Sequence, residues 1–396
     1  MDTNTKRLTR LRGYYFCYFG AQACMASYFN VYLQQQLGFG GRELGWFNGL
    51  TTLAPAAVLP LLGLWADRTG GSGLLTGALG AVLVGAGMLQ CQTGLAGAVF
   101  WGILWETARS ACVSLADRQT VALCGARGGY GAVRCFGSLG FLAGGMAVGF
   151  AAGRWALGRV LFPVYLTLVA LGLLLSVHLG RERPSFPPSA RSRAADTGGI
   201  WPLFRLPGFR LALLLGVQGS VAVSALQPYL GNHLVTTMGA SPAVLSWNTL
   251  CCVGPELLLL PLVGGRLLER WGFCATALLT TLALGVRCAV YALAPTPAVF
   301  LAGSLLYGFS VCAYTAVNLA LLRRAVPRER FAGAVLTNAA VSTMGRACFG
   351  WLFGVMYQRW GSGSIFWLLL GVALAVSGLL WLGRKGFPQK TEKPAV

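Results

Sequence analysis

The chain has 396 residues, of which 56% are hydrophobic and 11% are charged. Since an ordinary soluble domain has about 25% charged residues, this composition excludes a soluble enzyme and indicates a polytopic helical membrane protein. The formal net charge of +20 fits either a nucleic-acid partner or a membrane protein whose cations gather on one side. The position of the charges decides between the two.

A spanning helix needs about 20 mostly apolar residues. Twelve such segments, separated by Gly, Pro or charged residues, are expected at 13–37, 43–66, 73–92, 95–118, 130–152, 160–179, 208–232, 242–265, 274–294, 297–322, 331–356 and 363–383. The fold class expected is therefore an all-α polytopic membrane protein with two pseudo-symmetric bundles of six transmembrane helices.

The longest polar interruption, 181–207, is rich in Pro, Ser and Arg and is expected to be a flexible cytoplasmic linker. It separates an N-terminal six-helix bundle at 1–180 from a C-terminal six-helix bundle at 208–396 that ends in a short cytoplasmic tail.

An even number of spans puts both termini on one side of the membrane. If that side is the cytoplasm, its segments carry 22 of the 31 Lys and Arg residues and the opposite side carries 4. The positive-inside rule therefore predicts cytoplasmic termini in the cell membrane, inner or plasma. No single loop has a long basic tract, so we expect the lipid bilayer and a small-molecule substrate as partners, a monomer, and no nucleic acid.

The two halves repeat a short motif. Gly63-Leu-Trp-Ala-Asp67-Arg68-Thr-Gly70 and Gly265-Arg-Leu-Leu-Glu269-Arg270-Trp-Gly272 share the pattern G-x-x-x-acid-R-x-G, with starts 202 residues apart. This spacing predicts two parallel halves related by an axis along the membrane normal. The charged residues of both copies are expected to latch the halves in one access state.

The segment count, the central loop and the first motif copy resemble the major facilitator superfamily. Two stretches, Tyr130-Gly-Ala-Val-Arg134-Cys-Phe-Gly-Ser-Leu-Gly140-Phe and Gly285-Val-Arg287-Cys-Ala-Val-Tyr-Ala-Leu-Ala-Pro-Thr-Pro297, are similar to the branch that holds the lactose permease and related sugar, nucleoside and phenylpropionate permeases. The resemblance implies a solute permease driven by a proton gradient.

Charges inside membrane segments are the best site evidence, because they are costly there and usually face a cavity or an opposite charge. Asp117 ends segment 95–118 and Arg134 lies about one turn into the next segment. They are expected either to bind substrate or to form a structural salt bridge. The resemblance implies sugar binding for Arg134, for Asp117 with a one-residue shift, and ring stacking for Phe141, which could also simply pack.

Glu256 lies in the middle of segment 242–265, and Arg287 lies in the following segment. Glu256 is expected to be a substrate ligand, a proton carrier or a partner of Arg287. The resemblance implies that both residues take part in binding and coupling.

The chain departs from the lactose permease in segment 297–322. Tyr307 and Ser310 stand where that protein has a His and its proton-carrying Glu, and the segment contains no carboxylate. If protons are used, Glu256, Asp117 or Glu106 must carry them. Glu106 is spaced i, i+3 from Arg109, which favours an internal ion pair over a proton relay.

These observations predict a proton-coupled symporter of a small polar organic solute, such as a sugar, nucleoside or aromatic acid, working by alternating access around a central site. The alternatives are a drug/proton efflux antiporter and a non-transporting sensor or assembly factor. No nucleophile–base pair, metal-ligand spacing, Walker motif or haem motif occurs, so no enzyme, metal site or cofactor is expected.

Overall fold

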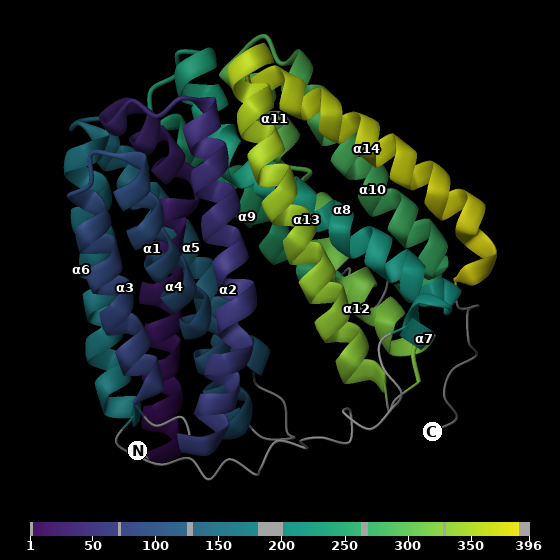
Figure 1. The fold of residues 1–396 in the computed structure, drawn as a ribbon, viewed down its shortest axis with the longest axis horizontal. Coiled ribbons are helices and arrows are strands. Elements are labelled where there is room, and N and C mark those ends of the chain that lie inside the picture. The colour runs from purple at the N-terminus through teal and green to yellow at the C-terminus, as the bar shows by residue number, and fades with distance from the viewer. Residues whose placement is uncertain are drawn as a thin grey trace. The chain divides into compact units, whose positions relative to one another are not determined.

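A computed structural model describes residues 3–69, 73–124, 130–180, 201–262, 268–327 and 330–387. Over these residues the structure consists of helices joined by short turns, with no strand (Figure 1). The all-α polytopic fold class expected from the sequence is confirmed.

Each apolar segment expected in the first half coincides with one helix. These helices are α1 (Thr3–Leu37), α2 (Gly41–Thr69), α3 (Leu74–Gln90), α4 (Leu95–Cys124), α5 (Tyr130–Ala152) and α6 (Leu157–Gly180). The α1 helix starts ten residues before the expected span because its basic first turns continue the helix outside the apolar stretch.

The second half is less regular. It contains α7 (Trp201–Phe204), α8 (Pro207–Asn232), the π-helical η2 (His233–Thr237), α9 (Val244–Leu262), α10 (Leu268–Leu293), α11 (Pro297–Ser304), the π-helical η4 (Gly308–Ala313), α12 (Tyr314–Ala325), α13 (Phe331–Trp360), α14 (Ser362–Leu382) and η6 (Gly383–Gly386). The expected segment 297–322 is thus divided into α11, η4 and α12. The short α7 lies inside the expected linker, of which residues 181–200 are outside the described residues.

Length and composition alone identify five helical spans among the described residues as able to cross a membrane. They are Ala132–Ala152, Leu157–Val177, Pro207–Thr237, Arg270–Leu293 and Ser362–Gly386. The α4 helix is less apolar because it carries Glu106, Arg109 and Asp117.

The contacts within the chain divide it into two units, which we describe separately. Unit 1 comprises Met1–Ser189 and Gln227–Thr249, and unit 2 comprises Ala190–Leu226 and Leu250–Val396. The end of α8, η2 and the start of α9 therefore group with unit 1. A boundary between two bundles at 181–207 stays a prediction.

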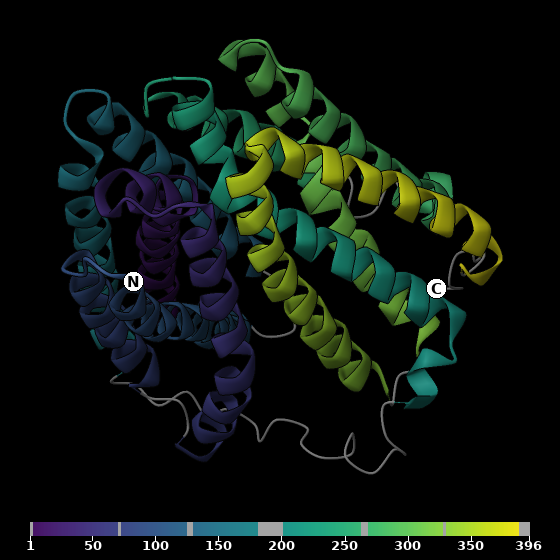
Figure 2. The same cartoon turned by 45° about the horizontal axis from the view of Figure 1, so that its top comes forward.

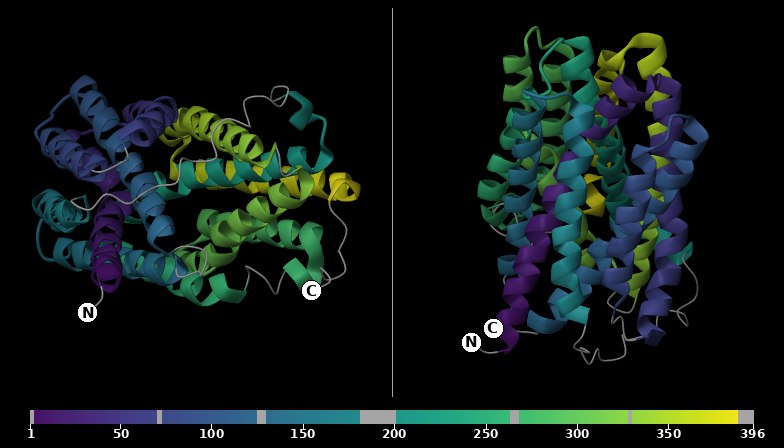
Figure 3. Two further views of the ribbon diagram at one scale, coloured as in Figure 1. Left: turned by 90° about the horizontal axis from the view of Figure 1, so that it is seen from below. Right: turned by 90° about the vertical axis from the view of Figure 1, so that its left-hand side faces the viewer.

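In unit 1, α1 runs alongside α5 and α6 (Figure 3). Glycines allow the close approach of α5, because a Cβ atom at Gly140 or Gly144 would collide with the backbone carbonyl of Phe16 or Gly20 in α1. This contact holds the beginning of α5, where Arg134 lies, next to the aromatic residues of α1.

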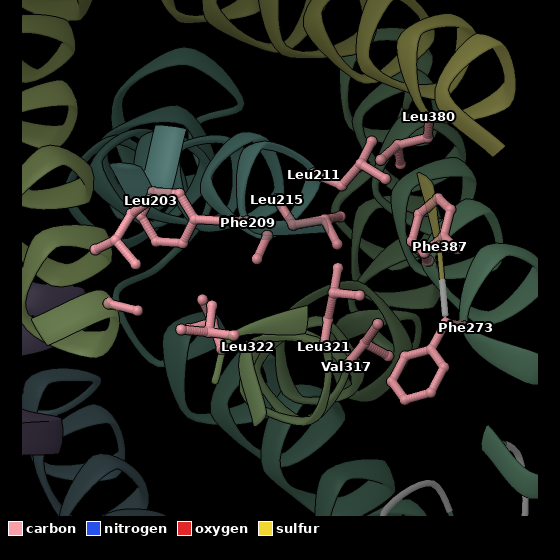
Figure 4. Close-up of a cluster of buried hydrophobic side chains, with 14 of the residues drawn as sticks. Leu203, Phe209, Leu211, Leu215, Phe273, Val317, Leu321, Leu322, Leu380 and Phe387 are labelled. Carbon is pink, nitrogen blue, oxygen red and sulfur yellow. The ribbon is translucent and has the colours of Figure 1, made fainter. Parts of the chain in front are cut away.

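In unit 2, α14 lies along α10, as the yellow and green helices of Figure 2 show. A buried hydrophobic cluster joins α7, α8, α10, α12 and α14 (Figure 4). Its labelled members are Leu203, Phe209, Leu211, Leu215, Phe273, Val317, Leu321, Leu322, Leu380 and Phe387. The cluster fixes α8 and α12 relative to each other, and both helices contribute polar side chains deeper in the unit.

Candidate functional site in each unit

The first polar cluster of unit 1 is an ion pair inside α4. The Arg109 guanidinium donates two hydrogen bonds to the Glu106 carboxylate, from Nε to Oε2 and from Nη2 to Oε1, and a third from Nη1 to Oε1 of Gln22 in α1. Tyr18 donates its hydroxyl proton to the Arg109 backbone carbonyl. The two-point pairing fixes the geometry of the two groups.

The face of the Trp105 ring covers this ion pair, with its centroid 5.6 Å from Arg109 Cζ. The Trp105 indole N–H in turn donates to the Tyr165 hydroxyl at 2.7 Å. The ring covers one side of the half-buried pair, and the carboxylate and the guanidinium satisfy each other within one helix, so this cluster has the character of a structural brace.

The second cluster of unit 1 contains Asp117 and Arg134, which the sequence predicts to be close together. The Tyr15 hydroxyl donates to Asp117 Oδ1 at 2.6 Å. Tyr130, the first residue of α5, interacts with both Asp117 and Arg134. A carboxylate from α4 and a guanidinium from α5 therefore meet around two tyrosines.

Aromatic rings surround the Arg134 guanidinium. Its Cζ lies 3.9 Å from the centroid of the Phe19 ring and 5.6 Å from that of the Tyr15 ring. Rings at these distances attract a cation through their electron-rich faces. Arg134 is half-buried, and Phe141, two turns further along α5, is also half-buried. The cluster therefore combines a carboxylate that accepts hydrogen bonds, a guanidinium that donates them, and flat aromatic ring faces.

The site of unit 2 is built around Arg287 in α10, which is only 1% exposed. Nε donates to the Tyr291 hydroxyl at 2.8 Å, Nη1 to Ser310 Oγ at 3.4 Å and Nη2 to Cys252 Sγ at 3.9 Å. The described contacts of this guanidinium are all with neutral groups. Full burial keeps Arg287 away from bulk solvent in this structure.

Tyr307 and Ser310, the two positions that depart from the lactose permease, both contact Arg287. The Tyr307 ring centroid lies 5.0 Å from Arg287 Cζ, and Ser310 accepts the hydrogen bond just described. Ser310 belongs to the π-helical turn η4. Such a turn is wider than an α-helical turn and rotates the following side chains, so it contributes to the presentation of Ser310 to the arginine.

Glu256 is half-buried on α9, one turn after Cys252. Because Cys252 Sγ contacts Arg287, Glu256 lies on a helix that touches the arginine side chain, and its role as ligand, proton carrier or partner of Arg287 stays a prediction. A hydroxyl pair supports the other side of Arg287, since the hydroxyls of Tyr291 and Ser304 are 2.7 Å apart.

Several residues of these clusters were not predicted. Tyr291 could have been found, because it is four residues after Arg287 and so lies on the same helix face. Tyr15 and Phe19 carry no such signal, since Tyr15 is 102 positions from the aspartate that it contacts.

The motif residues are only partly described. Gly70 and Gly265 lie outside the described residues, whereas Gly63, Asp67 and Arg68 belong to α2 and Glu269 to α10. Arg270 is exposed. Gly272 has φ 79° and ψ 173°, which interrupts α10 near its start. Among the described residues, no group of three His, Cys, Asp or Glu side chains is placed to hold a metal ion.

A model described as the MFS_1 like family matches residues 8–368 of the chain. The chain belongs to this family. As an MFS_1 like protein it is a multi-pass membrane transporter that moves a small molecule, and it is not an enzyme. The resemblance stated from the sequence is confirmed.

The MFS_1 like chain is 29% identical to a maltose permease of Geobacillus stearothermophilus over 378 residues, which cover 93% of this chain and 92% of that protein. Two solved structures share its fold. A mutant of the nucleoside transporter NupG has a TM-score of 0.80 at 14% identity, over 95% of this chain and 99% of that one. A bacterial homologue of the human lysosomal transporter Spinster, inward-facing and unoccupied, has a TM-score of 0.74 at 13% identity, over the full length of both chains.

Proposed function

We propose that the protein is a proton-coupled symporter that moves a sugar by alternating access. The observation that carries this proposal is the likeness to a maltose permease over 93% of the chain. The Asp117–Arg134 cluster supports it, because a sugar offers hydroxyl groups to a carboxylate and a guanidinium, and its ring edge can pack on an aromatic face. Asp117, Arg134 and Phe141 are the proposed solute contacts.

The three candidate proton carriers are given different roles in this proposal. Glu106 is engaged in a two-point pair with Arg109, which would have to break before the carboxylate could accept a proton. Asp117 accepts a hydrogen bond from Tyr15 and is assigned to the solute. Glu256, half-buried on α9, is the proposed proton carrier, and Arg287 is proposed to position Tyr307 and Ser310.

We also propose an oligomeric state, a membrane and a topology for the protein. It is a monomer in the cell membrane with two six-helix bundles and both termini in the cytoplasm, as the 22 cytoplasmic cations favour. The motif residues Asp67, Arg68, Glu269 and Arg270, with the glycines beside them, latch one access state.

The test is uptake of radiolabelled maltose into proteoliposomes with an imposed pH gradient. We expect accumulation above the equilibrium level, abolished by a protonophore. Uptake that only equilibrates at every pH would overturn coupling and leave a facilitator. Accumulation of uridine instead of maltose would mean that the substrate is a nucleoside and not a sugar. Extrusion of a cationic dye would favour a drug/proton efflux antiporter.

A pair of variants tests the proton carrier. Glu256→Gln is expected to keep maltose exchange but lose gradient-driven accumulation. Glu43→Gln is the matched control, because Glu43 accepts a hydrogen bond from the Gly40 N–H at 2.6 Å and caps α2. Normal accumulation by Glu256→Gln would remove the assignment.

A further inference from the structure

Three polar side chains of unit 2 converge on a glycine in α8. Measured from the position that a Cβ atom of Gly216 would occupy, Asn338 Oδ1 lies at 2.7 Å, Ser342 Oγ at 2.9 Å and Asn318 Nδ2 at 3.0 Å. Asn318 comes from α12, and Asn338 and Ser342 lie one turn apart on α13. We call this group the asparagine–serine notch.

The notch is buried but its hydrogen bonds are incomplete. Asn318, Asn338 and Ser342 are 8%, 9% and 6% exposed. The Oδ1 atoms of both asparagines and the serine Oγ are buried without a hydrogen-bond partner. Each such atom costs about 1–3 kcal/mol when it stays unsatisfied, and surrounding lipid offers no substitute partner. Three such unsatisfied atoms beside one glycine indicate that a polar ligand binds there.

A second buried amide of α8 lies on another face of the helix, because residues two apart do not share a face. Gln218, two residues after Gly216 on α8, is 5% exposed. Its Oε1 accepts from the Thr281 hydroxyl at 3.3 Å, while its Nε2 is buried without a partner. The groups that meet at Gly216 itself are the Asn338 oxygen, which accepts, the Asn318 amide nitrogen, which donates, and the Ser342 hydroxyl, which can do both.

This mixture selects the chemistry of the ligand. A bare cation would suit the amide oxygens but would face the Asn318 amide nitrogen. An anion would face the Asn338 oxygen, which lies closest to the glycine. A hydroxyl group both donates and accepts, so a neutral ligand with several hydroxyls satisfies the set.

We propose that the asparagine–serine notch is a subsite that binds hydroxyl groups of the transported solute, with the absence of a side chain at Gly216 letting the three polar groups come together against α8. This proposal rests on the proposed sugar transport and adds a recognition surface that lies wholly in unit 2. It is separate from the Arg287 site, whose described partners do not include these residues.

The proposal predicts opposite effects on stability and affinity. Asn338→Leu and Ser342→Ala remove buried polar atoms that lack partners, so the thermal unfolding temperature of the solute-free protein should rise. Titration calorimetry in detergent should show at least tenfold weaker maltose binding by both. If the notch only glued helices together, the same variants would unfold at lower temperature and bind maltose as before.

A glycine pair provides the matched test. Gly216→Ala puts a methyl group within 3.0 Å of all three polar groups and should weaken maltose binding at least tenfold. Gly371→Ala, in α14, puts the same methyl group in open space and should leave binding unchanged. Since alanine favours helix over glycine, a loss of affinity by Gly216→Ala without unfolding would come from the blocked notch.

The outcomes distinguish this inference from the proposed function. If maltose binds the wild type and all three notch variants equally, the groups hold ordered water only and the inference is overturned, with transport intact. If neither maltose nor uridine binds the wild type, both proposals are overturned. If maltose binds but is not accumulated under a pH gradient, coupling alone is overturned and the variants still decide the notch.

Discussion

Arg109 in unit 1 and Arg287 in unit 2 are both placed inside helices of the membrane region, but their partners differ. Arg109 is neutralised by Glu106, three residues away on the same helix. The described contacts of Arg287 are hydroxyls, a thiol and two aromatic rings. The first arrangement cancels a charge, whereas the second spreads it over dipoles and ring faces.

The two arginines differ in how they can respond when a neighbouring carboxylate gains or loses a proton. A two-point ion pair has little reason to change within a transport cycle, because separating it leaves two costly charges. A cation held by neutral groups keeps its net positive charge, and this charge attracts a nearby carboxylate. We therefore expect the unit 1 pair to govern stability and the unit 2 arginine to govern transport.

The largest effect on stability is expected for Glu106→Gln. It leaves the half-buried Arg109 guanidinium without a counter-charge, which costs about 2–3 kcal/mol. Thermal unfolding in detergent should show a large drop in midpoint. The double variant Glu106→Gln/Arg109→Gln should recover most of it, and a double variant as unstable as the single one would contradict the pair's role.

A smaller effect is expected for Tyr15→Phe, which removes the hydroxyl that donates to Asp117. Loss of a hydrogen bond to a charged group should destabilise by about 1.5 kcal/mol and weaken maltose binding. Tyr14→Phe is the control, because Tyr14 is equally buried and its hydroxyl makes only a 3.4 Å contact with the Cys112 carbonyl. Equal effects of the two substitutions on maltose affinity would remove Tyr15 from the site.

The smallest effect on stability, with the largest on transport, is expected for Arg287→Met. Replacing a buried charge by an apolar side chain of similar length is often neutral or stabilising, so the unfolding free energy should change by less than about 1 kcal/mol. Maltose accumulation in proteoliposomes should fall at least tenfold. A destabilisation as large as that of Glu106→Gln would erase the contrast between the two arginines.

The sequence predicts the helices well where apolar runs end in charge or glycine. The expected segment 130–152 coincides with α5, and 208–232 ends where η2 begins. The division of 297–322 into α11, η4 and α12 was not predicted, because hydropathy is insensitive to whether a turn is α-helical or π-helical.

The candidate site was predictable where its members are close in the sequence. The i, i+3 spacing predicts the contact of Glu106 with Arg109, and the short connection between α4 and α5 predicts that Asp117 approaches Arg134. Among the neutral partners of Arg287, Tyr291 follows from its i, i+4 spacing, whereas Cys252 and Ser310 belong to other helical elements and only packing brings them to the arginine. The asparagine–serine notch is not predictable from the sequence for the same reason, since isolated amides also serve as helix contacts.

The π-helical turn η4 has a consequence for how the chain tolerates insertions and deletions. A π-helical turn closes hydrogen bonds from i to i+5 and so contains about one residue more than an α-helical turn. Removing a single residue within Gly308–Ala313 would let η4 continue as an α-helix while turning Tyr307 or Ser310 away from Arg287 by about 100°. The length of the chain at this turn is therefore as much a part of the site as the identity of its side chains.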